Sequence, residues 1–145
     1  MKKNDLLKKE FLVPSNLTEV PAASARVLEV LAPLGLAESA QFDIRLCFEE
    51  ALINAMKYGN RFNSEIDVRV GVEAGSSEIR LSVEDQGDGF NPEKLENCTE
   101  PSNLTRPRGR GVFLIRKLMD RVEYNSKGNK LVMVKRVQKD PSSKS

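Results

Sequence analysis

A carboxylate and a carboxamide, Glu50 and Asn54, lie four residues apart in the sequence. On a helix this spacing places both side chains on one face, one turn apart. The Glu50 carboxylate could take a proton or orient a nucleophile, and the Asn54 amide oxygen is a ligand that suits Mg²⁺. The same residues could also belong to a solvated stripe with Asp43 and Lys57 on an amphipathic helix. The solvated stripe is enough to explain the helix by itself. The choice between a functional site and a solvated stripe therefore depends on the rest of the chain.

A second group of residues, Asp85, Gly87 and Gly89, follows a segment of alternating apolar and polar residues. Glycines two apart permit positive φ and let the backbone approach a ligand closely. An aspartate beside them can accept a hydrogen bond from an amine, such as the 6-amino group of adenine. An ordinary turn would give the same pattern. A calcium loop is excluded, because the further carboxylates and the terminal glutamate that it needs are missing.

A third group, Gly109 and Gly111, lies where a helix is expected to begin. The N-terminus of a helix offers free N–H groups and the positive end of its dipole, which suits phosphate. Arg106, Arg108 and Arg110 add positive charge around it. A flexible helix start with solvated arginines is the alternative explanation. The segment matches neither a Walker A loop nor a Rossmann fingerprint.

The composition limits the classes of function. The chain has 145 residues, of which 39% are hydrophobic and 30% charged, as in one globular domain. The formal net charge of +2 and the lack of a basic run argue against a nucleic-acid partner. The chain contains no histidine, which excludes a histidine nucleophile, a histidine phosphoacceptor and a histidine-dependent zinc site.

The cysteines and the hydropathy pattern bear on location. Cys47 and Cys98 form no framework of pairs, so a reducing cytoplasm is the expected setting. There is no run of about 18 apolar residues, and no membrane span is expected.

Periodicity predicts a β-α-α-β-β-loop-α-β-β order. We expect an α+β two-layer sandwich, with a mixed, mostly antiparallel sheet and helices on one face. The long polar loop is typical of a lid, and a single domain over residues 1–138 is followed by a disordered tail over 139–145. The expected strands cover residues 11–13, 66–72, 79–84, 122–125 and 131–137; the expected helices run from Ser15 or Asn16 to about Leu34, over 39–58 and over 109–120; and the loop covers 91–108.

In combination the three groups are more specific than any one of them. Their order resembles the GHKL ATPase superfamily, with its N, G1 and G2 boxes. Within it, the chain looks most like the stand-alone anti-sigma-factor serine/threonine kinases. The resemblance spans about residues 8–137 and depends on residues 50–59, 85–90, 109–115 and 118–120.

The resemblance implies roles for individual residues. Glu50 matches the catalytic base, Asn54 the Mg²⁺ ligand, and Asp85 the carboxylate that binds adenine. Two residues depart from the family pattern: Tyr58 stands where many members have histidine, and Asn129 where many have threonine. The residues implied in nucleotide binding are Asn54, Lys57, Asp85, Gly87, Gly89, Arg108, Gly109, Arg110 and Gly111.

The resemblance also implies a reaction and partners. ATP and Mg²⁺ are the expected cofactors, and the product is a phosphorylated serine or threonine on an anti-anti-sigma protein of the STAS type. A sigma factor is the second expected partner, and the protein is expected to be a cytoplasmic homodimer. The alternative is a non-catalytic module that sequesters a regulatory partner, with or without nucleotide. Partner binding that ignores ATP, ADP and Glu50→Ala would identify that module.

Overall fold

The structure is a computed structural model that describes residues 7–87 and 107–137, with side chains in the last helix described from Val112 onward. Most of the expected lid, the glycine at position 89 and the expected tail lie outside the described residues. Among the described residues, no helix is long and apolar enough to cross a membrane.

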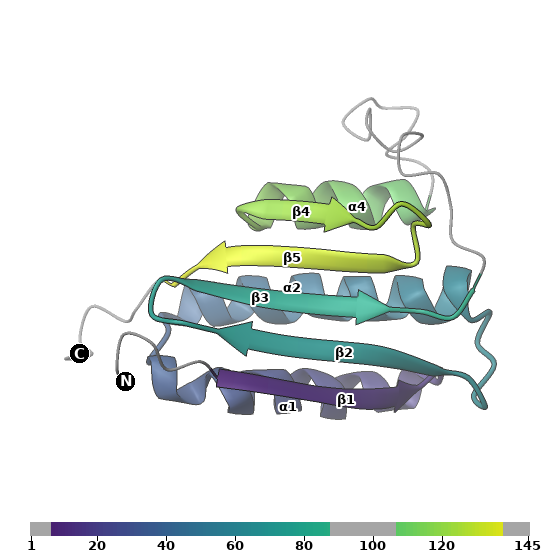
Figure 1. Cartoon of the computed structure of the whole chain (residues 1–145), viewed down its shortest axis with the longest axis horizontal. Coiled ribbons are helices and arrows are strands. Elements are labelled where there is room, and N and C mark those ends of the chain that lie inside the picture. The colour runs from purple at the N-terminus through teal and green to yellow at the C-terminus, as the bar shows by residue number, and fades with distance from the viewer. Residues whose placement is uncertain (1–6, 88–106, 138–145) are drawn as a thin grey trace.

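Over the described residues the sheet has five strands, in the order β1-β2-β3-β5-β4 (Figure 1). Every described pair is antiparallel, so the α+β class is confirmed and the sheet is more regular than the mixed one expected. The two hairpins, β2–β3 and β4–β5, were both predicted, the first of them from period-two alternation. The strands are β1 (Leu7–Pro14), β2 (Asp67–Ala74), β3 (Glu78–Glu84), β4 (Arg121–Tyr124) and β5 (Lys130–Arg136).

The helices lie together on one face of the sheet (Figure 1). The first predicted helix is divided into η1 (Leu17–Glu19), α1 (Val20–Leu31) and η2 (Ala32–Leu34). Pro21 lies in the first turn of α1, and Gly35 ends η2 with φ of 60°, a conformation that glycine adopts without strain. The remaining helices are α2 (Glu38–Asn54), the π-helical turn η3 (Ala55–Gly59) and α4 (Pro107–Leu118).

The core lies between α2 and the sheet. Ile44, Phe48, Leu52 and Met56 are fully buried on one side of α2 and η3, which confirms the apolar face predicted from their spacing. They belong to one cluster with the inward residues of the sheet. Burial of these side chains fixes α2 on the sheet. The inward-facing residues in the sheet include Val68, Val70, Val72, Ile79, Leu81, Val83, Leu131 and Met133.

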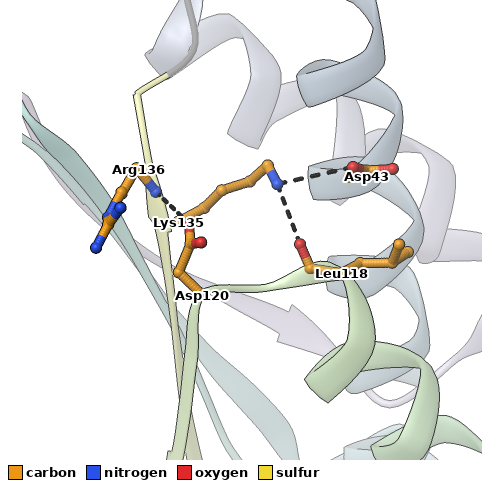
Figure 2. A network of polar contacts seen from close by, with 5 residues as sticks. All are labelled: Asp43, Leu118, Asp120, Lys135 and Arg136. Atoms are coloured by element: carbon orange, nitrogen blue, oxygen red, sulfur yellow. Dashed lines mark hydrogen bonds and ion pairs between the residues drawn. The ribbon is translucent and has the colours of Figure 1, made fainter.

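A buried lysine joins α2, α4 and β5 at one end of the helical layer. Lys135 Nζ donates a hydrogen bond to the Leu118 carbonyl (3.0 Å) and lies 3.7 Å from Asp43 Oδ2 (Figure 2). Asp120 Oδ2 accepts a hydrogen bond from the Arg136 backbone N–H (2.7 Å). The end of α4 is therefore fixed to both α2 and the sheet.

Candidate functional site

Glu50 and Asn54 lie one turn apart near the end of α2, and both side chains are partly buried. The predicted spacing is thus realised on a helix. Asn54 lines a pocket that also contains Asp85. The structure therefore brings the first and second groups of residues together, although they are far apart in the sequence.

The pocket lies where the end of α2, the end of β3 and the β4–β5 turn meet. Its walls combine apolar side chains with a carboxylate and two carboxamides, a lining suited to a flat heterocycle with polar edges. Its cavity volume is about 30 Å³. The lining residues are Ala51, Asn54, Ala55, Val83, Asp85, Tyr124, Gly128, Asn129 and Leu131.

Asp85 is only 7% exposed and is held by its neighbours. Its N–H donates to the Asn129 carbonyl (2.9 Å), and its own carbonyl accepts from Asn129 Nδ2 (2.8 Å). Its side-chain Oδ1 accepts a hydrogen bond from the Gly87 N–H (2.8 Å). Backbone and side chain are thus both fixed, which preorganises the carboxylate at the pocket wall.

Two glycines make this arrangement possible. A Cβ on Gly59 would overlap the Asp85 carboxyl group, and one on Gly87 would overlap the Gly59 carbonyl oxygen. Gly87 was predicted as a site residue, whereas Gly59 was interpreted only as a helix stop. No local pattern in the sequence indicates that η3 turns Gly59 onto Asp85.

Asn125 organises the β4–β5 turn that carries Asn129. Its Oδ1 accepts hydrogen bonds from the N–H groups of Gly128 (2.8 Å), Asn129 (3.0 Å) and Lys130 (3.2 Å). Its Nδ2 donates to Asn129 Oδ1 (2.7 Å). The Asn129 side chain is therefore oriented before any ligand binds. Asn125 was not among the site residues predicted from the sequence, although asparagine is a common residue of turns.

The other predicted site residues are less closely tied to the pocket. Lys57 is exposed, and its Nζ lies 5.3 Å from the centroid of the Tyr58 ring. Residues 108–111 lie in the first part of α4, so the third group of residues is at the start of a helix, as expected. Their side chains are outside the described part of the structure. Gly89 also lies outside the described residues.

Cys47 lies on α2 between Asp43 and Glu50 and is fully buried. Burial, assisted by the charge of Asp43, raises the pKa of its thiol to about 12. The thiol therefore stays protonated at neutral pH and does not supply a thiolate nucleophile.

The sheet with helices on one face, Glu50 and Asn54 on α2, and the pocket beside Asp85 are the features expected of a nucleotide-binding domain of the ATPase type. The chain belongs to the histidine kinase-like ATPase domain family, whose model matches residues 13–135.

Several curated relatives have the same name, serine-protein kinase RsbW. The protein from Oceanobacillus iheyensis is 27% identical over 131 residues, which cover 86% of this chain and 83% of the relative. That from Staphylococcus epidermidis is 28% identical over 139 residues, covering 90% and 87%. That from Staphylococcus aureus strain JH9 is 26% identical with the same coverage.

A solved structure has the same fold. It contains the RsbU and RsbW domains of Rv1364c from Mycobacterium tuberculosis, with a TM-score of 0.58 and 17% identity. The match covers 90% of this chain and 32% of the other. The chain therefore spans about a third of that larger protein.

Proposed function

We propose that this protein is an ATP-dependent serine/threonine protein kinase that acts as an anti-sigma factor and phosphorylates an anti-anti-sigma protein. Family membership and the similarity to serine-protein kinases support this reaction class. The observation that carries the proposal is the meeting of Asn54 and Asp85 in one pocket beside Glu50.

The lining of the pocket fits adenine. The apolar side chains of Ala51, Val83 and Leu131 can contact the two faces of a base, while the Asp85 carboxylate can accept a hydrogen bond from its 6-amino group. Asn129 adds a carboxamide at the edge. In this proposal Gly87 and Gly89 belong to the loop that contacts adenine.

The phosphates would extend toward the start of α4. The N–H groups of Gly109 and Gly111 and the side chains of Arg108 and Arg110 would bind them there. We assign Lys57 a further contact with the nucleotide. Its exposed position in η3, directly after α2, leaves its ammonium group accessible to an anion.

Asn54 would hold Mg²⁺ through its amide oxygen. Among the described residues, no group of three or more acidic, cysteine or histidine side chains could hold a metal ion. A single amide ligand suits Mg²⁺, which usually keeps several waters and is completed by substrate phosphates. When bound, the ion supplies neutralisation of phosphate charge.

Glu50 would orient the substrate hydroxyl and take its proton. The residue lies one turn before Asn54 on the same helix, so its carboxylate is on the side where the terminal phosphate would end. Phosphoryl transfer needs mainly positioning and charge stabilisation. A carboxylate on a rigid helix meets the first requirement.

We further propose the partners that the family resemblance implies: a sigma factor and a STAS-type anti-anti-sigma protein, bound in the cytoplasm by a homodimer. Light scattering should give twice the mass of one chain. A monomer at micromolar concentration would contradict the dimer without affecting the kinase assignment.

The first test is calorimetric titration of the wild type and of Asp85→Asn with ATP and Mg²⁺. We expect binding by the wild type and its loss in the variant, because the Gly87 N–H keeps the one amide oxygen and the NH2 group is left facing the adenine amino group. Unchanged binding by Asp85→Asn would remove adenine from this pocket. Absence of binding by the wild type would instead support a nucleotide-independent sequestering module.

A further inference from the structure

Asn60 is a buried asparagine outside the three groups of residues that the sequence singled out. It follows η3 directly and is only 4% exposed. Its Oδ1 accepts a hydrogen bond from the Gln86 N–H (2.8 Å), and its Nδ2 donates to Ser15 Oγ (3.0 Å) and to the Asp67 carbonyl (3.2 Å). One side chain thus connects the segment after β3 with the end of β1 and the start of β2.

The far side of this connection is equally well anchored. Ser15 is 1% exposed, and its hydroxyl donates to the Ile66 carbonyl (2.6 Å). The Asn60 N–H donates to the Ala55 carbonyl (2.9 Å), which fixes the backbone of Asn60 to η3. The carboxamide therefore has no freedom to follow Gln86 if that residue moves.

The bond from Gln86 matters because of where it acts. The Asp85 carbonyl and the Gln86 N–H belong to one peptide group. Asn129 Nδ2 holds the carbonyl of that group (2.8 Å), and Asn60 Oδ1 holds its N–H (2.8 Å). Because a peptide group is planar, two hydrogen bonds on opposite edges fix its orientation. That orientation determines where the Asp85 Cα–Cβ bond points.

We propose that Asn60 is a positioning residue that sets the direction of the Asp85 carboxylate and thereby the preference for adenine over other purines. The inference depends on the proposed binding of adenine to Asp85. Asn60 contacts the backbone beside the site rather than the base. Loss of the Asn60 side chain therefore lowers the preference for adenine more than it lowers the affinity for the phosphate groups of the nucleotide.

The test compares ATP with inosine triphosphate, which has a carbonyl oxygen in place of the 6-amino group. Asp85 accepts a hydrogen bond from the amine and repels the carbonyl oxygen, so the wild type should bind ATP more tightly. In Asn60→Ala we expect the ratio of the two affinities to fall by about fivefold, the effect of one hydrogen bond. Binding is measured by calorimetry, after thermal melting has shown that each variant is folded.

Two matched variants separate positioning from general destabilisation. Ser15→Ala removes a partner of Asn60 on the side away from Asp85, and Gln86→Ala removes a side chain while leaving its N–H in place. Both should lower the melting temperature or leave it unchanged and keep the wild-type affinity ratio. An Asn60→Ala variant that is folded and keeps that ratio would overturn the inference.

If Asn60→Ala fails to fold, hydrogen exchange in the wild-type protein tests the proposal instead. Protection of the Gln86 backbone N–H as strong as that of the N–H groups in β3 supports the proposed role of Asn60. Exchange of this N–H as fast as that of an exposed amide overturns it. Asp85→Asn tests the underlying function separately. If that variant keeps the wild-type preference for ATP, adenine does not bind Asp85, whatever Asn60 does.

Discussion

Gly59 and Asp85 occupy adjoining space in which no side-chain atom of residue 59 can fit. A Cβ built on Gly59 would lie 2.5 Å from Asp85 Cβ and would overlap the carboxyl carbon. The π-helical turn η3 brings the end of the α2 segment to this point. The contact joins the helix that carries Glu50 and Asn54 to the carboxylate proposed to bind adenine.

Gly59→Ala should therefore disturb nucleotide binding more than folding. The added methyl group must displace Asp85, whose backbone is held by Asn129, so we expect ATP affinity to fall by at least about tenfold, or ~1.4 kcal/mol. Calorimetry with ATP and Mg²⁺ measures the change. Gly71→Ala is the matched control, because its methyl group would meet only the Ser82 hydroxyl on the other face of the sheet. Equal loss in both variants would show a general effect of added bulk.

Glu50→Ala should separate binding from catalysis. Removing a general base lowers the rate of transfer by about 10²–10⁴-fold, while Asn54 and Asp85 remain in place to bind ATP. The measurement is transfer of labelled phosphate to the partner protein, alongside calorimetry. Glu49→Ala, one position earlier on α2, should keep near-normal transfer. Transfer that survives in Glu50→Ala would exclude Glu50 as the base.

Lys135→Met should destabilise the protein. The variant leaves the Leu118 carbonyl and the Asp43 carboxylate without their partner at the junction of α2, α4 and β5. We expect a loss of about 2 kcal/mol in the free energy of unfolding, typical of a broken hydrogen bond to a charged group. Urea denaturation measures it.

Two further variants check the source of that loss. Lys127→Met changes an exposed lysine in the β4–β5 turn and should leave the free energy of unfolding within about 0.5 kcal/mol. Asp43→Asn combined with Lys135→Met should cost less than the sum of the single changes, because the two residues are paired. Strict additivity would mean that the ion pair contributes nothing to stability.

The sequence was sufficient to predict those strands and helices in which buried residues recur at a regular spacing. Alternation at Val68, Val70 and Val72 predicted β2, and helical spacing at Ile44 and Phe48 predicted the buried face of α2. Both are confirmed, because local periodicity reflects which side of an element is buried. The meeting of Asn54 and Asp85 was predicted only through the family resemblance, since nothing local brings them together.

The parts that the sequence did not predict depend on contacts between distant segments. Lys135 is an inward-facing charge in β5, and its burial is stabilised by Asp43 and a helix carbonyl that no strand pattern reveals. Asp43 was consistent with a solvated stripe, but it faces this lysine. Asn60 lies just after a π-helical turn, a geometry without a reliable local signature, and its partners come from three other segments.

The thiol of Cys47 should make stability depend on alkaline pH. Its pKa is about 12 in the folded protein and 9.0 is its ordinary value. Between pH 9 and 12 the unfolded chain loses the thiol proton while the folded chain keeps it. Stability from this group is therefore complete below pH 9 and falls by ~1.4 kcal/mol per pH unit above it. Urea denaturation of the Cys98→Ser protein, with and without Cys47→Ala, isolates the effect from other groups that titrate there. The alanine variant should show the shallower decline, and parallel curves would mean that the thiol ionises equally in both states.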